Sequence, residues 1–236
     1  MQEAMRDLTT GESSSRGKLG RLALDDAPGA ITPEEVGAEL TANGATDVQI
    51  ITDDDADVVE RTGGGLDNDT FKVHKAWADW TEDGKSWIAF YGYWDYKAGF
   101  IGSGDPYDAA AMKVSGFNKD CWYNASEGVR TTDSEGHRTS GYTSKYSDGH
   151  AATIWNVNDD TQSFTLKTGH GFAWIEMRRD KSGCAADKEG KFWHEHNQNG
   201  NGGWSGGIDL WVFNLSYDGS GGQSLRKSTR LSTYNG

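Results

Sequence analysis

The stretch from Ser86 to Tyr96 constrains the fold of this chain more than any other, because six of its eleven residues are aromatic. Alternate side chains of a strand point to opposite faces. Two apolar sets result, one on each face: Trp87, Ala89, Tyr91 and Tyr93, and then Ile88, Phe90 and Trp94. A strand without a polar face needs apolar packing on both sides. The sequence therefore predicts a central strand with a layer of structure on each side of it.

Strand-like segments and turn-forming sequences alternate along the chain after Phe71. The turns are rich in Gly, Asp and Asn, as in 82–84 and 158–160. Glycine is abundant at 32 residues and proline scarce at 3, which is typical of many short strands joined by tight turns. We therefore predict a mainly β protein, whose body over residues 66–236 is an antiparallel β-sandwich or jelly roll of about ten short strands.

Residues 1–65 differ from the body in composition. All aromatic residues, 10 Trp, 9 Tyr and 8 Phe, follow residue 70, and residues 1–65 carry a net charge of −9 out of −13. A segment of this kind buries little apolar area by itself. Within it we predict a helix over 33–42, opened by the capping box Thr32–Glu35, then a strand over 47–52 and a helical turn over 53–60.

Three interpretations of residues 1–65 stay open. The segment is a solvated acidic tail, a pro-segment or export leader that is cut at Gly63–Gly65, or an arm that docks on a neighbouring subunit. The third interpretation predicts self-association through residues 1–65.

Charge argues against a nucleic-acid partner, and hydropathy argues against a membrane-spanning helix. The formal net charge of −13 disfavours nucleic acid, because a polyanion would be repelled. No apolar run approaches the roughly 20 residues of a membrane-spanning helix, so we expect no transmembrane segment. Met1–Arg21 also lacks the apolar stretch of a secretory signal.

The chain has two cysteines, Cys121 and Cys184. They are either two separate buried thiols or one disulfide that closes a long loop. A disulfide would indicate an oxidising compartment outside the cytoplasm.

His194 and His196 are candidate metal ligands, because an i, i+2 pair shares one face of a strand. Metal enzymes of the cupin type follow such a pair with a Glu a few residues later and then with another His. Here 197–203 contains no carboxylate and no His follows His196, so the match covers only its first half. Two strand histidines without a metal are the alternative.

Glu176 and Glu195 are candidate catalytic residues of a glycoside hydrolase. Such enzymes need two carboxyl groups about 5–9 Å apart across a cleft. Glu176 follows Trp174 on the same strand face, beside an aromatic side chain. The alternative pairs Glu176 with Arg178 or Arg179 on a polar surface.

The abundance of tryptophan is the remaining signal. Several tryptophans lie in polar, Gly- and Asn-rich sequence, and exposed aromatic rings flanked by amides suit the apolar face and the hydroxyls of a sugar. The predicted ligand-binding residues are Trp77, Trp80, Trp193, Asn197, Asn199, Asn201 and Trp204. A lipid interface or a subunit contact would use the same rings, and burial in the core is the other interpretation.

We therefore expect an extracellular or cell-surface protein that acts by binding a glycan or cell-surface component, with no cofactor. A secreted toxin or effector is a variant of this interpretation. The alternatives are a carbohydrate-active hydrolase that uses Glu176 and Glu195, a metal enzyme built on His194 and His196, and a self-assembling coat or fibre subunit with an N-terminal docking arm.

Overall fold

The computed structural model of the chain describes most of the predicted body and part of the N-terminal segment. The described residues are 33–42, 44–51, 57–62, 66–102, 107–139, 141–148, 150–162, 165–182, 184, 187–198, 204–209, 212–217 and 223–234.

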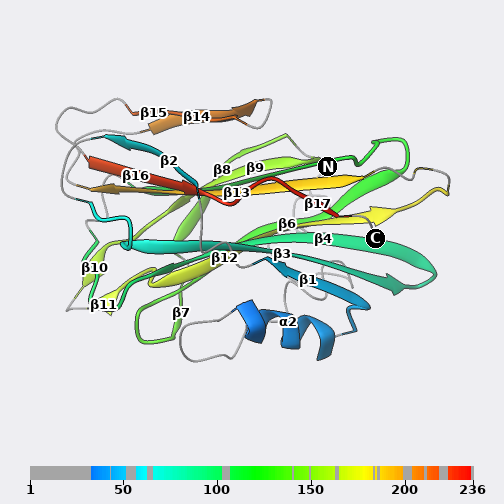
Figure 1. Cartoon of the computed structure of the whole chain (residues 1–236), viewed down its shortest axis with the longest axis horizontal. Helices are drawn as coiled ribbons and strands as arrows, with labels where there is room; N and C mark the ends of the chain where they lie inside the picture. The colour runs from blue at the N-terminus through cyan, green and yellow to red at the C-terminus, as the bar shows by residue number, and fades with distance from the viewer. Residues whose placement is uncertain are drawn as a thin grey trace, which may run out of the picture.

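Two antiparallel sheets lie face to face (Figure 1). The first sheet has the order β1-β3-β4-β12-β6-β7, with bounds Asp47–Ile51, Phe71–Glu82, Lys85–Tyr96, His170–Arg179, Trp122–Thr132 and Arg138–Thr139. The second has the order β2-β16-β13-β5-β9-β8, with bounds Asp57–Thr62, Gln223–Ser228, Lys188–Gln198, Asp108–Ser115, Ala152–Val157 and Tyr142–Ser147. Strand β17 (Ser232–Tyr234) also pairs with β13. The predicted antiparallel β-sandwich is confirmed.

Smaller elements cover the outer sides of the two sheets. Helix α2 (Pro33–Ala42) packs on β1 and β3 below the first sheet in Figure 1. The hairpin of β14 (Trp204–Asp209) and β15 (Val212–Tyr217) lies beyond the second sheet. Strands β10 (Thr161–Gln162) and β11 (Thr165–Leu166) form a short separate ribbon.

Strand β4 has the two apolar faces that its sequence predicts. Ile88, Phe90 and Trp94 belong to the core between the sheets. The alternate residues belong to a second core on the outer face of the first sheet: Trp87, Ala89, Tyr91 and Tyr93. Leu40 of α2 is fully buried in that second core. The helix therefore supplies the second layer that a strand without a polar face requires.

The helix prediction is confirmed with its bounds. Proline stands at the first helical position, where its missing N–H costs no hydrogen bond. At the other end Gly44 has a φ of 96°, the left-handed conformation that glycine adopts at helix C-termini. The N–H of Ala45 then donates to the carbonyl of Leu40 at 3.0 Å.

The strand predicted over 47–52 is confirmed as β1, but the N-terminal segment is more closely joined to the body than expected. Strand β1 pairs with β3 and β2 pairs with β16, so both join the sheets of the body. The expected helical turn over 53–60 is wrong, because β2 starts at Asp57. Residues 1–32 and 63–65 lie outside the described residues. Some strands are also longer than predicted, since β3 and β4 have 12 residues each.

Cys121 and Cys184 form a disulfide, with a Cα–Cα distance of 6.1 Å across a sequence separation of 63. It joins the β5–β6 connection to the β12–β13 connection, and each of these connections runs between the two sheets. In the chain-entropy model, closing a loop of this length stabilises the fold by about 4 kcal/mol.

A substitution at Gly92 would test how closely the two sheets pack. A Cβ at this position would lie 2.2 Å from Cγ of Phe192 on β13, so a methyl group must push the sheets apart or displace the ring. We expect Gly92→Ala to lower the free energy of unfolding by about 1–3 kcal/mol, measured by urea denaturation. Adding Phe192→Leu should cost less than the two single changes together; an additive loss would contradict the contact.

The disulfide gives a second prediction for stability. Replacing both cysteines, Cys121→Ser with Cys184→Ser, should lower the free energy of unfolding by about 2–4 kcal/mol. Wild-type protein unfolded in a reducing agent should match the double variant, while the variant itself should not respond to that agent. A variant as stable as the oxidised wild type would disprove the stabilising role.

Candidate functional site

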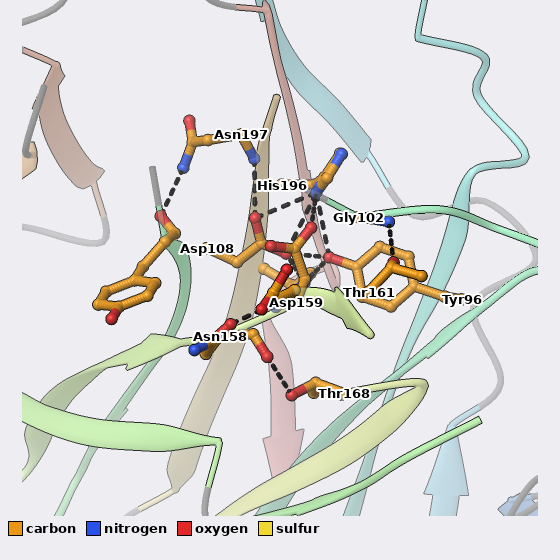
Figure 2. Close-up of polar contacts among 12 residues, drawn as sticks. Tyr96, Gly102, Asp108, Asn158, Asp159, Thr161, Thr168, His196 and Asn197 are labelled. Carbon is orange, nitrogen blue, oxygen red and sulfur yellow. Dashed lines mark hydrogen bonds and ion pairs between the residues drawn. The ribbon is translucent and has the colours of Figure 1, made fainter. Parts of the chain in front are cut away.

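A cluster of polar side chains is buried between the two sheets, where β4 ends and β5 begins (Figure 2). Its members are Tyr96, Asp108, Asp159, His194 and His196. Tyr96 is 5% exposed, and the other four have no exposed surface. Buried polar groups are costly unless they bind one another or a ligand. This cluster is therefore a candidate site for chemistry or for ligand binding.

The cluster is assembled by strand pairing. His194 and His196 alternate with outward-facing residues of β13 and point into the core between the sheets, where His194 stacks on Trp94 at 4.8 Å between ring centroids. Antiparallel pairing of β13 with β5 sets Glu195 opposite Ala109. Asp108, which precedes Ala109 in β5, therefore lies beside His196, which follows Glu195 in β13.

Asp108 is the centre of the hydrogen-bond network. Its Oδ1 lies 3.0 Å from Nδ1 of His196 and accepts the backbone N–H of Asn197 at 2.9 Å. Its Oδ2 accepts the Tyr96 hydroxyl and lies 3.6 Å from Nε2 of His194. The carboxylate is thus fixed by four partners, three of which come from β13.

Asp159 approaches His196 from the loop after β9. Its Oδ2 lies 3.3 Å from the same Nδ1 that faces Asp108. Gly102 makes this approach possible, because a Cβ there would lie 2.5 Å from Oδ2 of Asp159. The N–H of Gly102 in turn donates to Oγ1 of Thr161 at 2.9 Å.

The charges of the cluster follow from these contacts. Burial by itself lowers the pKa of His196, but the charge and hydrogen bond of Asp108, with a further contribution from Asp159, raise it to about 10. Burial raises the pKa of Asp108, but the charge of His196 and hydrogen bonds from both imidazoles bring it down to about 2. The pKa of His194 is lowered, mainly by burial. Without a metal, His196 is therefore an imidazolium and His194 is neutral.

Three of these residues have the geometry to hold a cation. Asp108, Asp159 and His196 each offer one ligand atom, and these atoms lie within 4.8 Å of one another. The sequence identified the imidazole of His196, but the carboxylates come from Asp108 and Asp159, far away in the chain. His194 lies beside this trio and is not part of it.

A pocket of about 480 Å³ opens next to this cluster, where β7 of the first sheet continues into β8 of the second. Its lining includes two exposed tyrosines, two threonines, an amide and a lysine: Tyr107, Tyr142, Thr139, Thr143, Asn156 and Lys167. This volume is within the range of small-molecule sites. Tyr107 directly precedes Asp108, and the lining residue Asn158 directly precedes Asp159.

Asn156 is the distinctive polar group of this pocket. Its Oδ1 is buried and has no hydrogen-bond partner among the described residues. An unsatisfied buried acceptor costs about 1–3 kcal/mol. A ligand that donates a hydrogen bond to this oxygen would recover that cost, whereas the neighbouring amide oxygen of Asn158 already accepts the backbone N–H of Asp160 at 2.9 Å.

The predicted exposure of Trp77, Trp80 and Trp193 is wrong. Trp77, Trp80 and Trp193 are 0%, 6% and 2% exposed, so none of them presents a ring to solvent. They pack in the core or against the sheets because a strand-rich chain with few aliphatic residues uses its indoles to fill these layers. Asn197 is buried too, and its amide donates to the carbonyl of Tyr107 at 3.1 Å. Asn199, Asn201 and the side chain of Trp204 lie outside the described parts.

The structure does not bring Glu176 and Glu195 together. Glu176 is buried on the outer face of the first sheet, where it accepts a hydrogen bond from the hydroxyl of Tyr91 at 3.3 Å. Glu195 is on the outer face of the second sheet and binds Nε of Arg226 at 2.7 Å. Two sheets about 10 Å apart separate these faces, so the acids do not share a cleft as glycoside hydrolysis requires.

Sequence reasoning missed Asp108, Asp159 and the tyrosine pocket. Asp159 lies in the turn-forming sequence 158–160, which indicates no chemical role by itself. The sequence does contain an indication for Asp108. This acid directly precedes the apolar run Ala109–Met112, so it lies at the start of a buried strand. No sequence pattern shows that it meets His196.

Comparisons with known proteins add little. No protein-family model and no curated protein sequence matches the chain. A solved structure titled pore forming protein has 6% identity and a TM-score of 0.36, over 80% of this chain and 100% of its own. Clostridium perfringens delta-toxin has 8% identity and a TM-score of 0.35, over 78% and 93%. Both scores are too low to establish a shared fold. In the described residues no helix is long and apolar enough to span a membrane.

The buried imidazolium predicts how stability depends on pH in protein kept metal-free by a chelator. The pKa of His196 is about 10 in the folded protein and about 6.5 in an unfolded chain. Its contribution is therefore complete below about pH 6.5 and is lost as the pH rises toward 10. We expect the free energy of unfolding to fall by up to about 1.4 kcal/mol per pH unit in that window.

The variant His196→Gln provides the control for this pH dependence. It removes the titrating ring, so its stability should change much less between pH 7 and 10, as measured by urea unfolding at each pH. Parallel pH profiles for the variant and the wild type would contradict the assignment. On the acid side, the lowered pKa of Asp108 contributes stability above about pH 4, which is lost as the pH falls toward 2.

Proposed function

We propose that the protein binds a glycan through the pocket between Tyr107 and Tyr142. The observation that carries this proposal is the buried, unpartnered Oδ1 of Asn156 in the pocket lining. The proposed ligand class is the one expected from the sequence, but the aromatic residues that bind it are tyrosines and not tryptophans.

The lining chemistry fits a pyranose ring better than a purely apolar ligand. Tyr107 and Tyr142 are 39% and 37% exposed, so each offers a ring face to the C–H groups of a sugar and a hydroxyl to its polar edge. A sugar hydroxyl can donate to Oδ1 of Asn156 and accept from an amide or hydroxyl nearby. The threonine hydroxyls of Thr139 and Thr143 extend the same polar edge.

The charge in the pocket favours a neutral sugar. Nζ of Lys167 lies 3.8 Å from Oδ2 of Asp160, and both side chains are about one-third exposed. The lysine charge is therefore largely balanced within the protein, and the formal net charge of −13 repels anionic ligands at longer range. An acidic glycan should bind more weakly than a neutral one.

The disulfide supports action outside the cytoplasm. Disulfides such as Cys121–Cys184 form and persist in oxidising compartments, where cell-surface glycans are found. A role as a secreted toxin or effector would begin with such recognition. Self-association through residues 1–65 stays a separate prediction, since residues 1–32 lie outside the described part of the chain.

A glycan array, followed by calorimetric titration of the best neutral ligand, tests the proposal. We expect Asn156→Leu to abolish binding, while its stability equals or exceeds that of the wild type because a buried unsatisfied acceptor is removed. Loss of binding without loss of stability is the distinguishing result. Full binding by Asn156→Leu would overturn the proposal, as would the absence of any ligand on the array.

A matched pair of tyrosines supplies the control. Tyr142 and Tyr146 lie on β8 with nearly equal exposure, 37% and 38%, but Tyr142 lines the pocket. We expect Tyr142→Ala to weaken binding at least tenfold, as for loss of a stacking ring, and Tyr146→Ala to leave it unchanged. Equal effects of the two changes would point to a general aromatic surface.

A further inference from the structure

We propose that Asp108, Asp159 and His196 form a binding site for a divalent transition-metal ion, buried between the two sheets. This site is separate from the glycan pocket and does not depend on the proposed function. It also differs from the His194 and His196 pair that the sequence suggested, because one imidazole acts with two carboxylates.

The distances within the trio match a coordination shell. Nδ1 of His196 lies 3.0 Å from Oδ1 of Asp108 and 3.3 Å from Oδ2 of Asp159. Around a metal with bonds of about 2.0–2.2 Å, neighbouring ligand atoms lie about 3–3.5 Å apart in tetrahedral or octahedral geometry. The ligand atoms of the two aspartates also lie within 4.8 Å of each other, so all three residues can reach one ion.

The charge of the trio also favours a dication. Two carboxylates and a neutral imidazole together carry two negative charges, which one divalent ion balances completely. With a proton in place of the ion the trio keeps one negative charge, and none of the three side chains has exposed surface. An uncompensated charge in such a place is costly.

The imidazole is built into the site and not merely near it. The ring of His196 is fully buried, and its Nε2 has no hydrogen-bond partner among the described residues. All of its polar contacts in Figure 2 therefore pass through Nδ1, the atom that faces both carboxylates. The edge of Phe100 packs against this ring, with centroids 4.9 Å apart, which fixes its orientation.

Neighbouring groups complete the surroundings of the ion. The N–H of Asn197 holds Oδ1 of Asp108 at 2.9 Å, and the Tyr96 hydroxyl lies 3.4 Å from Nδ1 of His196. Hydrogen bonds of this kind orient metal ligands. The donor set of carboxylate oxygens and one imidazole nitrogen suits Mn²⁺ or Zn²⁺ better than a soft metal, which prefers sulfur ligands.

Such an ion would tie together three segments that are distant in the sequence. Asp108 opens β5, His196 lies on β13, and Asp159 belongs to the loop after β9. The residues that precede the two aspartates, Tyr107 and Asn158, both line the glycan pocket. The ion would therefore brace the back of that pocket.

Metal loading of the full chain tests the site. Since the three residues are buried, the protein is unfolded with a chelator and refolded with Zn²⁺ or with Mn²⁺, then dialysed and measured by elemental analysis. We expect about one ion per chain, together with a higher urea midpoint than in chelated protein. Asp159→Asn, which keeps the size of the side chain, should lower the affinity at least tenfold.

An exposed cluster provides the matched control. His137 lies 3.3 Å from Asp133 and 3.9 Å from Glu135 at the surface, so His137→Gln removes an imidazole that also faces two carboxylates. This variant should bind the ion as the wild type does. Unchanged affinity in Asp159→Asn, or loss of the ion in His137→Gln, would place the metal elsewhere and overturn the proposal.

The wild type and His137→Gln together decide the question if Asp159→Asn does not fold. A urea midpoint that rises with Zn²⁺ or Mn²⁺ in both the wild type and His137→Gln supports the buried site. A midpoint that neither ion changes, with less than a tenth of an ion retained per chain, overturns it. Neither result depends on whether the pocket binds a glycan.

Discussion

The absence of a polar face on β4 is the constraint on which the rest of this structure depends. One face of the strand packs in the core between the sheets and the other packs in the core beneath α2. Because burial of apolar surface is the dominant favourable term in folding, a strand of this kind has to lie inside three layers. The second sheet and the helix supply the two outer layers, and the disulfide Cys121–Cys184 links two of the connections between the sheets.

This three-layer arrangement also determines which aromatic residues meet solvent. Trp77 belongs to the core between the sheets, and Trp193 lies on the outer face of β13 but is only 2% exposed, so neither indole reaches solvent. Tyr142 and Tyr146 lie on β8, an edge strand with one side open. The residues available for recognition are therefore tyrosines at the rim of the sandwich. Composition gives the number of aromatic rings in a chain. Which of these rings are exposed depends on the elements that pack on each strand.

The same constraint concentrates polar chemistry at one end of the core. His194 fits among aromatic neighbours by stacking on Trp94, and its strand neighbour His196 is drawn into contact with Asp108 and Asp159. In a layer so rich in rings, a charged group persists only where other groups balance it. The cluster and the pocket share a border because Tyr107, which lines the pocket, directly precedes Asp108, the buried first residue of β5.

Local periodicity and capping were enough to predict the fold class, the helix over 33–42 and the two faces of the central strand. The sequence also identified His196 as a candidate ligand. The partners of His196 depend on long-range contacts, since Asp108 reaches it through strand pairing and Asp159 through a loop that is distant in the chain. Burial of the tryptophans was likewise decided by coverage from other elements, which period-2 alternation within one strand cannot show.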